Sequence, residues 1–304
     1  MFHPAVFIYS SHNRGYHIHR WWVVEPALRS PHNKTIFHVP FSMHERHQQE
    51  YDWGTFRWFY DQYRKWGLEA STFFWDENMS KKDAEIFIDR LLNAEVVVLG
   101  GGNPYVGMER FLRLGEKYFG NRDLVNGIMW QRALHGKMSI GFSAGASQLS
   151  QFLGTDGTPG FGLAKNIVAV LHHEWGREGQ IQEYANRFHH CLAFGLPNDS
   201  GIAVQEGRLP SGHFWQIMEF VIDNTWDHPQ DHWHIKTRQG LKIVHKYKDG
   251  RDWHFNHGDF MVRVIAHDNS WQRGWIYNAG GLFDYESQHQ IPYVPMDHLL
   301  ASLG

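Results

Sequence analysis

The chain has 304 residues, 42% of them hydrophobic and 20% charged, and its formal net charge is -3. This composition excludes an intrinsically disordered chain, and the near balance of charge excludes a protein that binds nucleic acid through phosphate charge alone. The single Cys, Cys191, excludes an intramolecular disulfide, and no apolar run approaches the roughly 18 residues that span a bilayer. Because the N-terminal segment also lacks the pattern of a signal peptide, we expect a cytoplasmic protein with no membrane partner.

Strand-like and helix-like stretches alternate through residues 1–210. Short β-branched or aromatic runs predict strands at 5–9, 35–39, 70–75, 95–99 and 138–142. Apolar residues at helical spacing predict helices at 51–67, 80–93, 106–114 and 124–134. This alternation predicts an α/β three-layer sandwich, in which helices cover both faces of a mostly parallel central sheet.

From His213 onward the pattern becomes strand-like and rich in turns. Further strands are predicted at 215–222, 241–247, 260–266 and 274–277, with Lys248-Asp249-Gly250 as a hairpin turn. We therefore divide the chain into an α/β domain at residues 1–212 and a β-rich C-terminal extension at residues 213–304. The sequence does not indicate what the extension does.

Two Gly-rich turns follow predicted strands at the same edge of the sheet. Residues 141–145 have the pattern Gly-x-Ser-x-Gly between a strand and a helix, which is typical of a nucleophile elbow that exposes Ser143 in a strained turn. The Ala144 N–H, at the start of that helix, would stabilise an anionic tetrahedral intermediate. The second turn, at 100–103, would supply another N–H from Gly101 or Gly102, and we assign Gly102 to this oxyanion hole.

Five segments in chain order match a known family. They are VFIYSS, FHVPFS, VVVLGGGN, GFSAGA and GLPNDSGIAV, which begin at residues 6, 37, 96, 141 and 195. Together they resemble the peptidase E and cyanophycinase family of serine peptidases over residues 1–210. The resemblance implies a class I glutamine amidotransferase-like fold and a serine triad that cleaves a peptide or isopeptide-type amide in a small substrate. It implies no metal or organic cofactor.

The resemblance also assigns roles to individual residues. Ser143 matches the nucleophile, and Asp156 stands where peptidase E carries the acidic third member. His173 matches the general base when Arg177 is used as an anchor, and His172 is the alternative. Because adjacent residues of a strand point to opposite faces, only one of the two histidines can reach Ser143.

Two residues, Asn103 and Arg177, are assigned to substrate binding. In the family, basic residues after the catalytic His accompany acidic side chains at the cleaved bond, and Arg177 could supply the guanidinium that such a side chain needs. The sequence departs from the family elsewhere, since Gln180 and Gln182 stand where Arg is frequent and Asn198 stands where an acidic residue is common. Acidic specificity therefore stays open.

Other interpretations are kept beside the hydrolase. A catalytically silent family member that binds partners through its extension is the alternative function, and an amidase acting on a non-peptide amide is a third. The His-x-His pairs at 17–19 and 232–234 would place two imidazoles on one face of a strand, but chance pairs are expected among 23 His, so no metal is assigned. Nucleic acid is not an expected partner, whereas a homodimer is retained.

Overall fold

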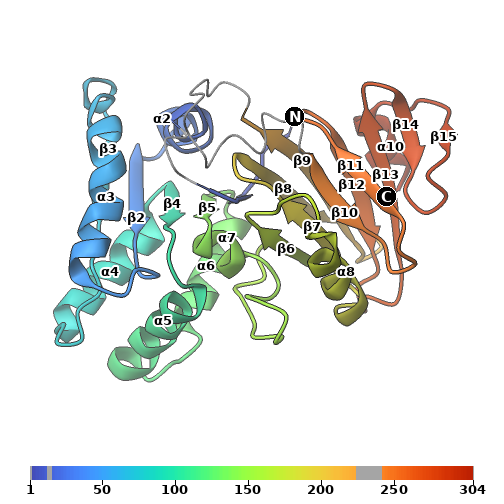
Figure 1. Cartoon of the computed structure of the whole chain (residues 1–304). Helices are drawn as coiled ribbons and strands as arrows, with labels where there is room; N and C mark the ends of the chain where they lie inside the picture. Colours follow the sequence, from blue (N-terminus) through green and yellow to red (C-terminus); the bar gives the residue numbers. More distant parts are fainter. Residues whose placement is uncertain (1, 12–15, 224–241, 304) are drawn as a thin grey trace.

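The computed structural model describes residues 2–11, 16–223 and 242–303 (Figure 1). Its strands are β1 (Val6–Tyr9), β2 (Thr35–Val39), β3 (Glu69–Thr72), β4 (Val96–Leu99), β5 (Met138–Phe142), β6 (Ile167–Leu171), β7 (Leu192–Leu196), β8 (Ser200–Arg208), β9 (Phe214–Ile222), β10 (Ile243–Lys246), β11 (Asp252–Phe255), β12 (Phe260–Ile265), β13 (Gln272–Asn278), β14 (Gly281–Asp284) and β15 (Gln290–Ile291). Its helices are α1 (Tyr16–Ile18), η1 (His19–Val24), α2 (Glu25–Arg29), α3 (Arg46–Asp61), η2 (Arg64–Trp66), α4 (Lys81–Asn93), α5 (Pro104–Phe119), α6 (Leu124–Leu134), α7 (Ala144–Leu149), α8 (Glu178–Arg187) and α10 (Met296–Ser302).

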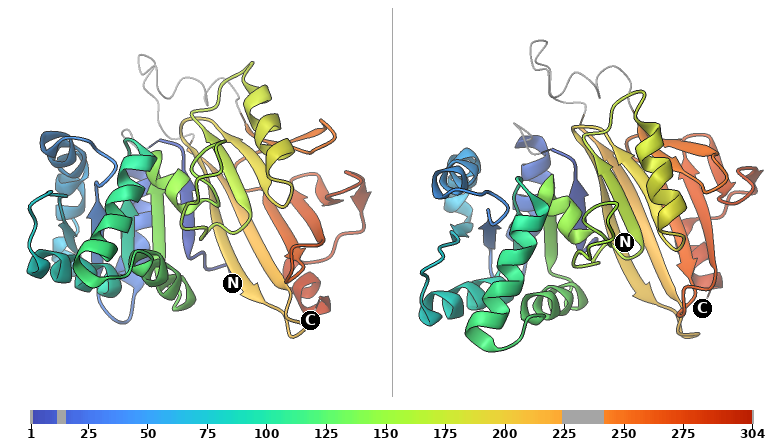
Figure 2. Two further views of the ribbon diagram at one scale, coloured as in Figure 1. Left: turned by 90° about the horizontal axis from the view of Figure 1, so that it is seen from below. Right: turned by 60° about the horizontal axis from the view of Figure 1, so that its bottom comes forward.

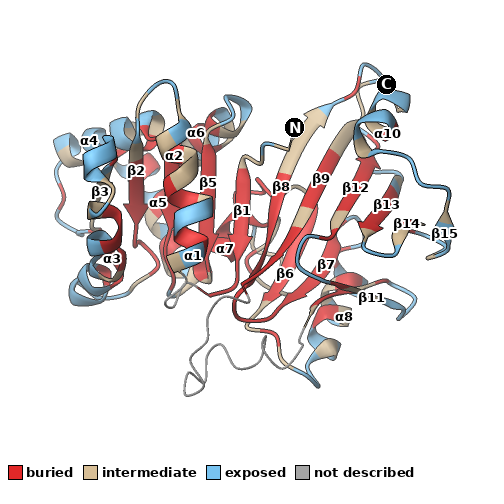
Figure 3. Cartoon of the chain, turned by 90° about the horizontal axis from the view of Figure 1, so that it is seen from above, coloured by how far each residue is buried: buried red, intermediate tan, exposed pale blue. Residues whose placement is uncertain are grey.

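The strands form two sheets. The main sheet is 11-stranded with the order β15-β14-β13-β12-β9-β8-β1-β5-β4-β2-β3, and the second is 4-stranded with the order β11-β10-β7-β6. The fold is therefore a mixed α/β arrangement with a β-rich C-terminal part, and Figure 3 shows that the strands of the main sheet are largely buried.

The first half of the main sheet is parallel and has helices on both faces. Strands β3, β2, β4, β5 and β1 all run in one direction. Residues alternate between the two faces along each strand. In β4, Val96 and Val98 share a buried cluster with residues of α1, η1, α2 and α3, whereas Val97 and Leu99 share one with residues of α4, α5 and α6. This half is the predicted three-layer arrangement.

The second half of the main sheet is antiparallel, so the prediction of a mostly parallel sheet is wrong for the sheet as a whole. β8 pairs antiparallel with β1 on one side and with β9 on the other. The short turn at 209–213 explains the β8–β9 pairing, because two strands joined by so short a turn can pair only in opposite directions. The predicted boundary at 212/213 lies in this turn, and strands from both sides of it belong to one sheet.

In this half a second sheet, rather than a layer of helices, packs on the main sheet. Phe220 of β9 stacks on Phe255 of β11 with ring centroids 3.6 Å apart, and Phe194 of β7 lies 5.6 Å from Phe220. The outer face of the second sheet is covered by α8, whose Ile181 and Ala185 pack on β6 and β7. Figure 2 shows α7 between α5 and this second sheet, so α7 lies where the helical layer meets the second sheet.

Candidate active site

Ser143 lies at the turn from β5 to α7. Its backbone angles are φ 50° and ψ -112°, a strained conformation for a residue other than glycine. The flanking glycines make the turn possible. A Cβ on Gly141 would lie 2.2 Å from the Gly145 carbonyl oxygen, and a Cβ on Gly145 would lie 2.2 Å from the Leu99 carbonyl oxygen. The chain therefore packs so closely at this turn that only glycine fits at positions 141 and 145, as the predicted elbow requires.

A histidine from the second sheet meets this serine. His172 directly follows β6 with φ 54°, and its Nε2 lies 3.0 Å from the Oγ of Ser143. The backbone N–H of His172 donates to the hydroxyl oxygen of the buried Ser10 at 2.7 Å. Ser143 and His172 thus come from different sheets, and the packing of those sheets sets the distance between them.

His173, our first choice for the base, does not reach Ser143. Its side chain is fully buried against Gly195 beneath α8, and its backbone N–H donates to the Leu196 carbonyl at 2.9 Å. Adjacent residues at a strand end point to opposite faces, so His173 points away from Ser143 when His172 points toward it. Burial lowers the pKa of His173, so its imidazole is held neutral inside the protein. The alternative, His172, occupies the site.

The partner of His172 is an amide rather than a carboxylate. Its Nδ1 lies 2.6 Å from the Oδ1 of Asn198, which follows β7 and is 2% exposed. The register explains the contact, because Leu171 and Leu196 are partners in the parallel pair β6–β7 and their strand ends are side by side. We did not assign Asn198 from the sequence. Asn198 stands where the family often has an acidic residue, and that match could have identified it as the partner of the histidine.

Asp156, predicted as the third member, lies elsewhere. Its exposed carboxylate accepts hydrogen bonds from the hydroxyls of Tyr105 at 3.1 Å and Thr158 at 2.7 Å, and from the Thr158 N–H at 3.1 Å. The bonds from Thr158 are the main reason why the pKa of Asp156 is lowered. In the described ranges, no hydrogen bond joins Asp156 to either histidine. It instead links its turn to the first turn of α5.

The two residues predicted for the oxyanion hole have N–H groups without an acceptor in the described part of the chain. Ala144 is the first residue of α7, where an N–H has no partner within the helix. Gly102 has φ 121°, and a Cβ there would lie 2.3 Å from the Ser42 carbonyl oxygen. A hydrogen bond of 3.1 Å from Gly145 N–H to the Gly100 carbonyl ties the two turns together.

The residues predicted to bind substrate lie at two helix starts. Asn103 caps α5, since its side-chain oxygen accepts from the N–H groups of Tyr105 at 3.0 Å and Val106 at 3.4 Å. Arg177 is exposed and directly precedes α8. Its charge is among those that lower the pKa of His173, after burial. The roles of both residues in substrate binding stay predictions.

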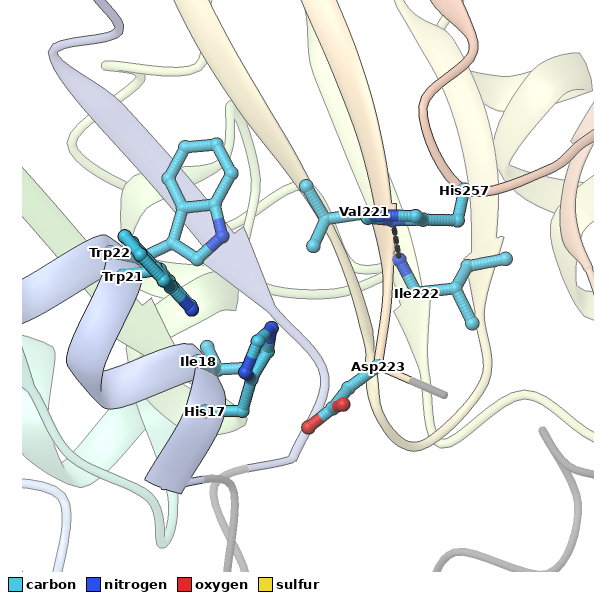
Figure 4. Close-up of a pocket in the computed structure, with 8 residues that line it drawn as sticks. All are labelled: His17, Ile18, Trp21, Trp22, Val221, Ile222, Asp223 and His257. Carbon is cyan, nitrogen blue, oxygen red and sulfur yellow. Dashed lines mark hydrogen bonds between the residues drawn. The ribbon is translucent and has the colours of Figure 1, made fainter. Parts of the chain in front are cut away.

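Two cavities lie near this edge of the sheet. One has a volume of about 300 Å³ and is lined by Ser147, Leu153, Thr155, Ala169, Val170, Leu171, Gln180, Glu183 and Tyr184. A more apolar one of about 410 Å³ lies between η1 and the end of β9. Figure 4 shows the indoles of Trp21 and Trp22 on one side of it, His257 on the other and the Asp223 carboxylate between. Ser143 and His172 line neither cavity, but Ser147 of α7 and Leu171, which directly precedes His172, line the first.

The histidine pairs do not form a metal site that the structure describes. His17 lies in α1 and His19 begins η1, so this pair is helical rather than on a strand, and His19 is buried while His17 is exposed. The pair at 232–234 lies outside the described residues. Among the residues that the structure describes, no group of three or more His, Cys, Asp or Glu could hold a metal ion. Within the same ranges, no helix is long and apolar enough to cross a membrane.

Comparison with known proteins gives a likeness in fold. No protein-family model matches the chain, and no curated protein matches it in sequence. Among solved structures, the chain is similar to the crystal structure of a peptidase from an acI-B1 Actinobacterium, with a TM-score of 0.53 and 14% sequence identity. The match covers 87% of this chain and 98% of that one. At this identity the similarity concerns the fold alone.

Proposed function

We propose that this protein is a serine hydrolase that cleaves a peptide or isopeptide-type amide bond in a small substrate. The observation that carries the proposal is the 3.0 Å contact between Ser143 Oγ and His172 Nε2, made at a strained turn between a strand and a helix. Nucleophile and base within hydrogen-bond reach, with a third group on the base, are the signature of nucleophilic catalysis. The fold shared with a peptidase and the resemblance to the peptidase E family, with its class I glutamine amidotransferase-like fold, support the same interpretation.

The proposed reaction follows from these positions. Ser143 Oγ attacks the carbonyl carbon while His172 Nε2 takes the hydroxyl proton, and the carbonyl oxygen becomes an oxyanion that the N–H groups of Ala144 and Gly102 would bind. Collapse of this intermediate breaks the C–N bond, and the leaving nitrogen takes the proton from Nε2. A water molecule then attacks the acyl-enzyme in the same way and returns a proton to Ser143. No step requires a metal or an organic cofactor.

Asn198 has the role of a positioning residue. Its Oδ1 can only accept, so His172 Nδ1 carries the proton and the lone pair of Nε2 faces Ser143, which is the tautomer that a general base needs. A neutral amide cannot neutralise the imidazolium that forms when the proton moves. We therefore expect a slower enzyme than one with a carboxylate at this place.

An active-site-directed fluorophosphonate tests the proposal, with the labelled residue located by mass spectrometry. Ser143→Ala should abolish labelling. The matched control is Ser139→Ala in the same strand, because Ser139 is buried and its hydroxyl has no partner among the described residues. The control should be labelled like the wild type.

The alternative is a protein that binds partners without catalysis. The observation that favours it is the neutral side chain of Asn198 beside the histidine. It would be supported if the wild-type protein resisted labelling and left a panel of dipeptides and simple amides uncleaved.

A further inference from the structure

The smaller of the two cavities lies between α7, the end of β6 and α8. Ser147 lies one helical turn after Ser143, to whose carbonyl its N–H donates at 3.2 Å, and Leu171 directly precedes His172. Both residues line the cavity, whereas Ser143 and His172 do not, so the cavity lies next to the two segments that carry the reacting atoms. Its volume of about 300 Å³ is at the small end for ligand sites, which suits one side chain better than a long segment of substrate.

The lining of this cavity is polar and has one formal charge. Ser147, Thr155, Gln180 and Tyr184 offer hydroxyl and amide groups, and the carboxylate of Glu183 is the charged group among the described residues of the lining. Glu183 is exposed on α8, and within the described ranges no ion pair engages it.

The surroundings of the cavity add negative charge. The pKa of Tyr184 is raised to about 12, mainly by burial and in addition by the nearby groups Tyr105, Glu183 and Asp156. Glu183 and Asp156 therefore both act on the same wall of the cavity. Two arginines near α8 lie outside the lining. Arg187 donates to the Asp156 carbonyl oxygen at 3.3 Å, and Arg177 is exposed directly before α8.

We infer that this cavity is the subsite for the side chain on the acyl side of the cleaved bond, and that Glu183 makes it select an ammonium or guanidinium group over a carboxylate. The inference rests on the proposed function. A cationic side chain would pair with Glu183 and donate to the oxygens of Thr155 and Gln180, whereas a carboxylate would meet a like charge and no guanidinium. This preference is the reverse of the acidic specificity that the family resemblance implies.

The experiment compares three substrates that differ only in this side chain, with Lys, Gln or Asp before the cleaved amide. Wild-type kcat/KM should follow the order Lys, Gln, Asp. Glu183→Gln should reduce the Lys-to-Asp ratio about tenfold, as expected for one partly screened ion pair together with one like-charge contact, and Glu183→Arg should reverse the order. The matched control is Glu178→Gln, which removes the same charge from the same helix outside the lining and should leave the ratio unchanged.

Side-chain-matched diphenyl aminoalkylphosphonates give a second readout that needs no turnover, because Ser143 Oγ displaces phenoxide from phosphorus at a rate that depends on the same subsite. A faster reaction of the Asp-type probe, equal rates for all three, or a ratio unaffected at Glu183 would overturn the inference. Labelling by a simple fluorophosphonate separates the two hypotheses. If Ser143 is labelled while these ratios fail, the subsite is wrong and the hydrolase stands; if Ser143 is not labelled at all, the hydrolase itself fails.

Discussion

The two halves of the main sheet contribute to the candidate site in different ways. The parallel half ends its strands in Gly-rich turns between helical layers, and one of these turns holds Ser143. The antiparallel half carries a second sheet on one face, and the parallel pair β6–β7 within that sheet places His172 and Asn198 side by side. The local turn thus determines the conformation of Ser143, whereas the packing of the two sheets determines whether His172 reaches it.

The largest expected effect separates the two histidines at the end of β6. His172→Ala should lower kcat/KM about 10,000-fold, because it removes the group that takes the Ser143 proton. His173→Leu should stay within about threefold of the wild type, since the His173 side chain is buried and its ring nitrogens have no partner in the described part of the chain. Melting temperatures would show that both variants fold. Loss of activity in His173→Leu with retention in His172→Ala would reverse our assignment.

The next prediction tests the close contact between the two turns of the parallel half. Gly145→Ala should lower the free energy of unfolding by at least about 3 kcal/mol, because its Cβ would lie 2.2 Å from a backbone oxygen that cannot move aside. Gly127→Ala in α6 is the matched control. It is exposed with nothing within 4 Å of the new Cβ and should stabilise the protein by about 0.5–1 kcal/mol. Urea unfolding of both variants measures the difference, and equal effects would contradict the close packing at the elbow.

The parallel half was largely predictable from its sequence, because each of its elements carries a local signal. The ranges 35–39, 124–134 and 138–142 coincide with β2, α6 and β5, and the glycines around Ser143 identify the elbow without tertiary information. The segment 16–29, to which we assigned no element, is helical. Its sequence shows no clear helical period, and the segment is stabilised by packing against the main sheet.

The antiparallel half was predictable as strands but not as an arrangement. The strand predictions at 215–222 and 260–266 agree closely with β9 and β12, yet nothing local indicates that the β-rich part shares a sheet with β1 or that a second sheet forms. The structure brings His172 rather than His173 to Ser143, and the sequence did not reveal this for the same reason. It depends on which face of β6 the neighbouring sheet covers, and that is a long-range property.

The pH dependence of the unfolding free energy tests His245, a buried residue of the second sheet. His245 of β10 is buried, its Nδ1 lies 2.9 Å from the Ala193 carbonyl oxygen and its Nε2 lies 2.8 Å from the Tyr285 hydroxyl. Burial lowers the pKa of His245 from 6.5 to about 4. Between these values the unfolded chain binds a proton that the folded chain does not, so stability falls as the pH decreases from about 6.5 to about 4, by up to about 3 kcal/mol.

His245→Gln should remove most of this dependence, and His254→Gln, at a less buried position of β11, should keep it. The quantity to compare is the difference in unfolding free energy between pH 7 and pH 4 for each variant, since the substitution at His245 also alters stability at neutral pH. An unchanged difference in His245→Gln would show that the acid sensitivity does not come from His245.

The smallest expected effect concerns Asn198, which contacts His172 at the end of the second sheet. Asn198→Ala should lower kcat/KM about 100-fold by freeing the His172 ring, whereas Asn198→Asp should raise it by about three- to tenfold, because a carboxylate also stabilises the imidazolium. The same charge favours the protonated ring before the reaction, so the acidic limb of the pH–rate profile should move to higher pH in Asn198→Asp. A gain in rate without that movement would mean that the aspartate acts on substrate rather than on His172. A loss in both variants would mean that the buried position, 2% exposed, penalises the new charge more than the imidazolium benefits from it.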